Sequence, residues 1–112
     1  MNPGCVFCRI VSRQLPATIV AEHDRFLAFR DINPVAPVHV LIIPSEHVES
    51  AAQVADPLVV GELVAFAGQV AASERLDEGW RLVTNVGRNG GQTVFHLHFH
   101  LLGGRRMGWP PG

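Results

Sequence analysis

Three histidines occupy alternate positions near the end of the 112-residue chain, at His96, His98 and His100. Side chains in a strand alternate between two faces, so an extended segment would present all three imidazoles on one face and the intervening apolar residues on the other. A single histidine is often structural, but three on one face are poorly explained in that way. We therefore interpret this row as a site of chemistry.

Two kinds of chemistry fit the histidine row. Neutral imidazoles bind metal ions, and one imidazole held in a fixed tautomer by its neighbours can act as a nucleophile. Along a strand, His96 and His100 would lie about 13 Å apart, whereas a metal ion holds each nitrogen at about 2 Å. This distance argues against one ion bound by all three residues, and the spacing alone decides no more than that.

A glycine-rich segment leads directly into the histidine row. Gly90 and Gly91 allow close approach of the backbone to a ligand, and successive N–H groups can form an anion-binding concavity. Asn85, Gln92 and Thr93 add amide and hydroxyl groups. Such a segment by itself is most often a plain turn, but its connection to the histidines favours phosphate binding.

Cys5 and Cys8 have the spacing of a zinc half-site. Two buried inert thiols or a redox pair are the alternatives, and the spacing leaves the other ligands open. Asp31 ends a predicted strand, where its carboxylate could accept hydrogen bonds from ribose hydroxyls. A solvated loop carboxylate is the plainer interpretation of Asp31.

The composition describes one small globular domain, with 47% apolar and 17% charged residues and a formal charge of −1. No block of basic residues is present, which argues against electrostatic binding of long nucleic acids. No apolar run reaches the roughly 20 residues of a membrane span, and the N-terminus is too short and interrupted for a secretory signal. We expect a cytoplasmic protein without membrane or long nucleic-acid partners.

The elements that must position these residues predict an α+β domain with an antiparallel sheet of about five strands. One long helix is expected over 57–75, with Asp56 as N-cap, Pro57 in the first turn and Gly79 as the stop signal. Apolar residues at Val59, Leu63, Phe66 and Val70 would form its core-facing stripe. The other expected elements are a short helical turn at 6–12 and strands at 18–22, 26–30, 38–43, 80–85 and 94–102.

These residues resemble the histidine triad (HIT) family, and in particular its nucleotide-binding, purine nucleoside phosphoramidase branch. The resemblance rests on HLHFHLL at 96–102, on nearly the whole chain before it, and on the WPPG tail at 109–112. It implies that His98 is the nucleophile that forms a nucleotidyl-histidine intermediate. It further implies that His100 contacts the phosphate and assists protonation of the leaving group, and that His39 and His96 orient the nucleophile.

The resemblance also implies a purine nucleotide ligand. The ribose would bind Asp31, with Ile32 beside it, and Trp109 in the tail would shape leaving-group specificity. The phosphate-binding positions implied by the family are Asn85, Gly91, Gln92 and Thr93. The positions implied to line the base pocket are Val6, Phe7, Ile10, Phe29 and Leu41.

The family further implies a structural Zn²⁺ held by Cys5, Cys8, His47 and His96, with no catalytic metal or organic cofactor. It implies a homodimer in which the two sheets join, with residues 1–102 as the HIT domain and the tail 103–112 reaching the partner's active site.

The expected function is hydrolysis or transfer at the α-phosphate of purine nucleoside 5′-phosphoramidates. The alternatives are a dinucleoside polyphosphate hydrolase and a nucleotide- or zinc-binding interaction module with little turnover. A metal-dependent hydrolase that uses the histidine row as ligands is a weaker reading.

Overall fold

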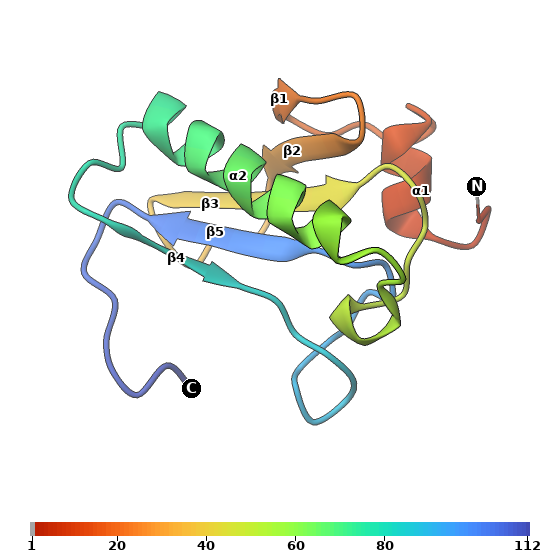
Figure 1. Cartoon of the computed structure of the whole chain (residues 1–112). Coiled ribbons are helices and arrows are strands. Elements are labelled where there is room, and N and C mark those ends of the chain that lie inside the picture. Colours follow the sequence, from red (N-terminus) through yellow and green to blue (C-terminus); the bar gives the residue numbers. More distant parts are fainter. Residues whose placement is uncertain (1) are drawn as a thin grey trace.

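A computed structural model describes residues 2–112 of the chain. It is built on one five-stranded antiparallel sheet with the strand order β1-β2-β3-β5-β4, as Figure 1 shows. The predicted α+β class with an antiparallel sheet is confirmed. The elements are α1 (Val6–Val11), β1 (Ile19–Glu22), β2 (Phe26–Arg30), β3 (Val38–Pro44), a 3₁₀ turn (Ala51–Gln53), α2 (Pro57–Ser73), β4 (Trp80–Val83) and β5 (Phe99–Gly103).

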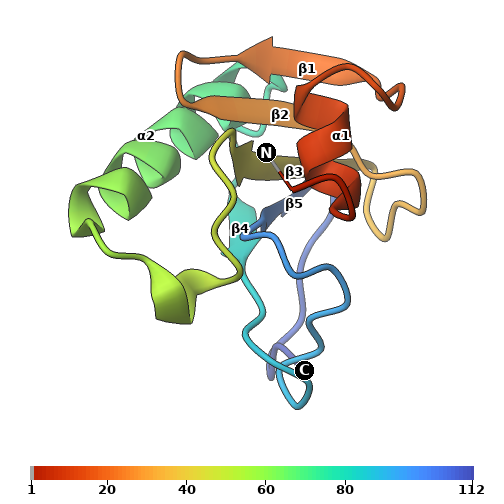
Figure 2. The same ribbon diagram turned by 90° about the vertical axis from the view of Figure 1, so that its right-hand side faces the viewer.

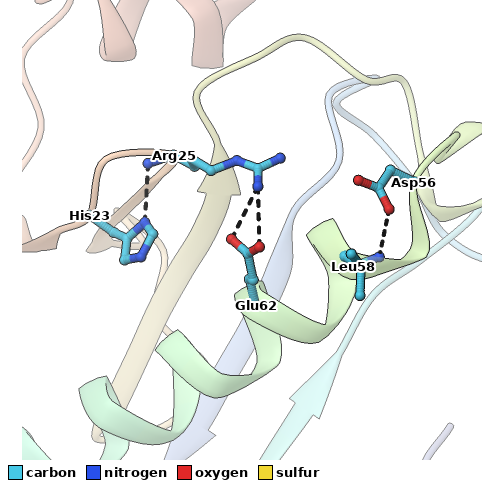
Figure 3. A network of polar contacts seen from close by, with 5 residues as sticks. All are labelled: His23, Arg25, Asp56, Leu58 and Glu62. Atoms are coloured by element: carbon cyan, nitrogen blue, oxygen red, sulfur yellow. Dashed lines mark hydrogen bonds and ion pairs between the residues drawn. The ribbon is translucent and has the colours of Figure 1, made fainter.

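The helix α2 covers one face of the sheet and begins as the sequence predicts. The Asp56 carboxylate accepts a hydrogen bond from the Leu58 amide at 3.0 Å, and Pro57 occupies the first turn. Arg25, in the turn between β1 and β2, pairs with Glu62 on the helix (Figure 3). These contacts fix the first half of α2 against the hairpin that carries β2.

The buried stripe of α2 forms the main core with one face of the sheet. Leu63, Phe66 and Val70 are buried as expected, and Val59 packs against the same cluster from a partly buried position. The strand residues of this core include Ala28, Val40, Ile42, Phe99 and Leu101.

The end of α2 differs from the expectation. The helix ends at Ser73 rather than at 75, and Arg75, not Gly79, takes the left-handed conformation after it, with φ of 60°. The Arg75 amide donates to the Ala72 carbonyl and the Leu76 amide to the Ala71 carbonyl, which is a Schellman arrangement. Leu76 is buried in the main core, and this apolar contact, which often accompanies a Schellman cap, offsets the cost of the left-handed conformation at Arg75.

The opposite face of the sheet is only partly covered. The short helix α1 lies against β2 and β3 on the side away from α2 (Figures 1 and 2), and Phe7, Ile10, Phe29 and Leu41 are buried with it in a second apolar cluster. Toward β4, the same face carries His39, His100 and Arg81. The register interleaves these polar residues with Leu41, Leu102 and Val83 across β3, β5 and β4.

The predicted strand at 94–102 is wrong in its first half. The ladder includes only Phe99–Gly103, and the predicted strand at 80–85 likewise ends at Val83. The reason is that side chains replace the ladder there: the His98 ring bonds the His96 carbonyl at 2.7 Å, and the Thr84 hydroxyl donates to the His98 carbonyl at 2.8 Å. His96 and His98 therefore stand on a chain held by these bonds and not on a regular strand.

The smaller differences lie at strand ends, where β1 begins one residue later than expected and β3 ends one residue later. The expected hairpin between β1 and β2 is present, with His23 exposed in its turn. The expected irregular tail at 103–112 begins one residue later, because Gly103 still pairs in β5; residues 104–112 form no helix or strand. Of residues 2–112, none belongs to a helix that is long and apolar enough to cross a membrane.

Candidate functional site

The N-terminus of α1 brings two thiols against two imidazoles from distant parts of the chain. Cys5 Sγ lies 3.3 Å from His96 Nδ1, and Cys8 Sγ lies 3.3 Å from His47 Nδ1 and 3.6 Å from His96 Nδ1. Cys5 and Cys8 are not joined by a disulfide. The four ligand atoms all lie within 4.8 Å of one another, which is a group able to hold one metal ion.

The donor set of this cluster fits zinc. A tetrahedral zinc ion, with bonds of about 2.3 Å to sulfur and about 2.1 Å to nitrogen, separates its sulfur and nitrogen ligands by about 3.5 Å. The observed sulfur–nitrogen distances of 3.3 to 3.6 Å match this edge. The His96 Nε2–H donates to the Pro44 carbonyl at 2.8 Å, which leaves the Nδ1 lone pair facing the thiols.

The hydrogen bond of His98 fixes its tautomer. Its Nδ1–H donates to the His96 carbonyl at 2.7 Å, so the second ring nitrogen, Nε2, carries a lone pair. The ring is 6% exposed, and Phe7 packs edge-on against it with 5.1 Å between ring centroids. The bond and the packing therefore fix the orientation of the His98 ring, and in its neutral form the lone pair available for nucleophilic attack lies on Nε2.

A second chain of contacts joins Asp31, His39 and His100. The Val35 amide donates to His39 Nδ1 at 3.1 Å, so His39 carries its proton on Nε2. That nitrogen lies 2.9 Å from His100 Nδ1 and 3.3 Å from Asp31 Oδ2. Because His100 Nδ1 accepts this proton, the proton of neutral His100 is on Nε2, away from His39.

Burial keeps these imidazoles uncharged. Burial and the neighbouring His98 and His39 rings lower the pKa of His100 to about 4, although Asp31 opposes the shift. Burial likewise lowers the pKa of His39, with the Asp31 carboxylate acting in the opposite direction. At neutral pH the site therefore presents hydrogen-bond donors and lone pairs rather than imidazolium charge.

His96 and His100 belong to different groups of neighbours. The first lies with the two cysteines, whereas the second lies with Asp31 and His39. His98 stands between them, with its ring centroid 5.1 Å from that of His100. The structure thus separates a metal-ligand cluster from a proton-bearing cluster and gives no single group that contains all three members of the row.

Two hollows flank the second cluster. The first, of about 370 Å³, is lined by Thr18, Arg30, Asp31 and Ile32 among others. The second, of about 450 Å³, is lined by His39, His100, Asn85, two arginines and residues of the tail. Asp31 therefore lies at one hollow and is connected through His39 to His100 at the other.

The residues expected to line a base pocket fall into two sets. Phe7, Ile10, Phe29 and Leu41 are packed together under α1 in the second apolar cluster. Val6 is exposed. The structure therefore places four of the five expected pocket residues in packed core. Ile32, expected beside the ribose site, is 91% exposed next to Asp31.

The glycine-rich segment forms a closed turn. The Gly91 amide donates to the Arg88 carbonyl and the Gln92 amide to the Gly87 carbonyl. Gly91 has φ of 85°, and a Cβ on Gly90 would lie 2.4 Å from the Val86 carbonyl oxygen, so both positions require glycine.

The polar side chains of this segment are dispersed. Gln92 is buried and donates to the Glu49 and Val94 carbonyls. Thr93 lines a hollow beside Cys5 and His47, while Asn85 lines the hollow of His39 and His100. Only Asn85 of the expected phosphate-binding residues thus shares a hollow with His100.

Sequence reasoning missed the two arginines in that hollow, Arg81 and Arg105. Arg81 precedes Val83 by two residues on β4, and residues two positions apart on a strand point to the same face. Only the register of β4 against β5 shows that this face carries His100. Arg105 lies in the tail, where no periodicity could have placed it.

The fold and this arrangement of histidines define a histidine-triad protein. The HIT domain model matches residues 12–107, and the chain belongs to this family. It is 47% identical to an uncharacterized HIT-like protein of Synechococcus elongatus, over the full length of both chains. It is 46% identical to a 14 kDa zinc-binding protein of Brassica juncea, covering 96% of this chain and 98% of that one.

Among solved structures, a HIT family hydrolase from Legionella pneumophila superposes with a TM-score of 0.94 at 47% identity, covering 97% of this chain and 100% of that chain. The fold is therefore that of a protein named as a hydrolase of this family.

Proposed function

We propose that this chain hydrolyses purine nucleoside 5′-phosphoramidates at the α-phosphate through a nucleotidyl intermediate on His98. The observation that carries the proposal is the bond from His98 Nδ1–H to the His96 carbonyl, which leaves Nε2 as a lone-pair nucleophile in a site with His100. An imidazole nitrogen with a free lone pair attacks without a separate base.

The proposed reaction has two displacements. His98 Nε2 attacks phosphorus, and the phosphorus–nitrogen bond breaks with its electron pair on the departing amine, which takes a proton from water. The remaining hydroxide then attacks phosphorus, the bond to His98 breaks, and the nucleotide leaves, so that one water is consumed. The Nε2–H of His100 would stabilise the phosphoryl oxygens and the leaving nitrogen as charge moves.

The nucleotide contacts follow from the two hollows. Asp31, with Ile32 beside it, lines the hollow next to His39, and its carboxylate would accept hydrogen bonds from the ribose hydroxyls. Asn85 lines the hollow of His100 and would contact the phosphate. Phosphate binding by Gly91, Gln92 and Thr93 stays a prediction, as does the base pocket.

We propose that Cys5, Cys8, His47 and His96 hold a structural zinc ion. The sulfur–nitrogen distances support this, and the relative from Brassica juncea is named a zinc-binding protein. Bound zinc would lock α1 to the segment before β5 and so fix the carbonyl that orients His98. Free buried thiols suit a reducing compartment such as the cytoplasm.

We also propose that two copies associate through the edge strand β4, which continues the sheet. Within residues 2–112, β4 is paired only with β5 and has one open edge. Trp80 on β4 and Val64 on α2 are each about 40% exposed, an apolar surface suited to a second copy. Trp109, 84% exposed in the tail, is the residue proposed to reach the partner's site.

The proposal is tested by comparing wild type with His98→Ala for turnover of an adenosine 5′-phosphoramidate and for binding of AMP. We expect turnover to fall about a thousandfold or more while AMP still binds, because the missing group forms the intermediate. His23→Ala, which removes an exposed histidine from the β1–β2 turn, is the matched control and should keep wild-type rates. Wild-type turnover by the His98 variant would refute the assignment.

A further inference from the structure

The hollow that holds His100 carries an excess of positive charge. Its lining includes the guanidinium groups of Arg81 and Arg105, and no aspartate or glutamate belongs to it. Neither arginine forms an ion pair among the described residues, whereas Arg13, Arg25 and Arg30 each pair with a glutamate. The two guanidinium charges are therefore available to bind an anionic ligand.

Both guanidinium groups are positioned by backbone carbonyls. Arg81 Nη2 donates to the Gly108 carbonyl at 2.7 Å, and Arg105 Nη2 donates to the Val35 carbonyl at 3.0 Å. A carbonyl orients a guanidinium without cancelling its charge, and each guanidinium has five N–H donors, so most donors stay free. Such oriented forks bind carboxylate and phosphate groups with two parallel hydrogen bonds.

The two arginines lie next to the reacting centre of the proposed function. His100 lines the same hollow, and Val83, which follows Arg81 by two residues on β4, lies directly opposite His100 in the ladder. The ring centroid of His100 is 5.1 Å from that of His98. This hollow shares no lining residue with the one at Asp31 and Ile32, so a group bound here would occupy a separate place beside His100.

We propose that this hollow receives the leaving group and selects one that carries a carboxylate or phosphate a few atoms from the departing nitrogen. This inference rests on the proposed hydrolysis at His98. Arg81 and Arg105 would bind the anion, and apolar residues such as Leu102, Met107 and Pro110 would pack against the linking carbons. A cationic amine would meet two like charges in a lining that contains no aspartate or glutamate.

The test compares adenosine 5′-phosphoramidates that share the reacting bond and differ only at the far end of the leaving group. The four amines are 4-aminobutanoate, its neutral amide, 3-aminopropyl phosphate and 1,4-diaminobutane. The charge lies several bonds from the departing nitrogen, so it changes little in the chemistry of the bond itself. For wild type we expect kcat/KM for the anionic substrates to exceed that for the amide by about tenfold, and that for the cation to be lowest.

Variants assign the preference to residues. Arg81→Gln and Arg105→Gln should each lower the ratio of anionic to neutral kcat/KM by about three- to fivefold, with little change for the neutral amide. Arg106→Gln is the matched control, because this neighbouring arginine carries the same charge but does not line the hollow. Raising the salt concentration should lower the preference for anions in wild type but not in a variant that combines Arg81→Gln with Arg105→Gln.

The outcomes separate the two proposals. Turnover of all four substrates at similar rates would overturn the inference about the hollow and leave hydrolysis at His98 intact. A preference for anions that Arg106→Gln reduces as much as Arg81→Gln does would also overturn it, because the effect would then be a general one of net charge. No turnover of any of them would overturn both. A preference for the carboxylate over the phosphate, or the reverse, identifies which source of anion the hollow fits.

Discussion

His39 Nε2 lies 2.9 Å from His100 Nδ1, although 61 positions separate the two residues in the chain. The contact exists because β3 and β5 are neighbours in the sheet with antiparallel register. The Val35 amide donates to His39 Nδ1, so the His39 proton is on Nε2 and is donated to His100 Nδ1. The proton of neutral His100 must then be on its Nε2. His39 is accordingly a positioning residue that acts through His100.

Replacing His39 separates this role from simple packing. His39→Leu removes the donor and should lower kcat by about fivefold with a smaller change in KM, because one oriented hydrogen bond is worth about 1 kcal/mol. His39→Gln places an amide N–H near the position of Nε2 and should restore most of the rate. Steady-state kinetics on an adenosine phosphoramidate measure both. Equal losses in the two variants would mean that the ring matters for its shape and not for its proton.

Lowering the pH should destabilise the fold in a defined window. Burial lowers the pKa of His100 from 6.5 to about 4 and also lowers that of His39. Between these values the unfolded chain binds more protons than the folded chain, so the free energy of unfolding decreases as the pH falls from about 6.5 to about 4. Above about 6.5 this contribution is fully present.

Urea unfolding across this range, with excess chelator so that metal binding does not vary, measures the slope. His100→Gln should flatten it, whereas His23→Gln, which removes an exposed histidine, should leave it as in wild type. If wild type and His100→Gln had parallel slopes, the stability loss would come from other groups.

The sequence predicted the elements better than it predicted the segment that carries the chemistry. Helix α2 could be placed because Asp56 and Pro57 mark its start and its buried residues recur at helical spacing. The end of α2 could not, because Arg75 adopts a conformation that sequence rules assign to glycine. There, packing of Leu76 outweighs local preference.

The histidine row shows the same limit. Alternation predicted that the apolar residues of this segment share one face, and Leu97, Phe99 and Leu101 all lie in the main core. It could not show that His96 and His98 leave the ladder, because that depends on bonds to Pro44 and Thr84, 52 and 14 positions away. Nor could it place Arg81 and Arg105 beside His100, since long-range register brings them there.

Removing either thiol should lower the zinc content and the melting temperature of the protein more than it lowers the rate of hydrolysis. Cys5→Ser and Cys8→Ser each replace a thiolate of the four-ligand cluster, and a hydroxyl is a poor ligand for zinc. We expect one zinc per chain in wild type purified without added metal, loss of this zinc in both variants, and a lower melting temperature.

Chelator added to wild type should give the same decrease, and Ser12→Ala, at the end of the same helix, should retain the metal. Absence of metal from wild type, with unchanged melting in both cysteine variants, would rule out a zinc site.

The shared proton of His39 makes a prediction about the ribose. Asp31 Oδ2 and His100 Nδ1 both lie within reach of His39 Nε2, at 3.3 and 2.9 Å. When a ribose hydroxyl donates a hydrogen bond to Asp31, the carboxylate becomes a weaker acceptor for the His39 Nε2–H. The hydrogen bond from His39 to His100 should then become stronger. Asp31→Asn should therefore lower affinity for ribonucleotides and also change kcat.

Substrates with and without the ribose hydroxyls separate these two effects. With a 2′,3′-dideoxyadenosine phosphoramidate, any effect of Asp31→Asn acts through His39 alone, since no hydroxyl is left to bind. We expect Asp31→Asn and removal of the hydroxyls to be non-additive, with a coupling of about 1 kcal/mol in kcat/KM. Additive losses would show that Asp31 and the ribose do not interact. Coupling confined to KM would show that Asp31 binds the sugar without influence on the pair of histidines beside it.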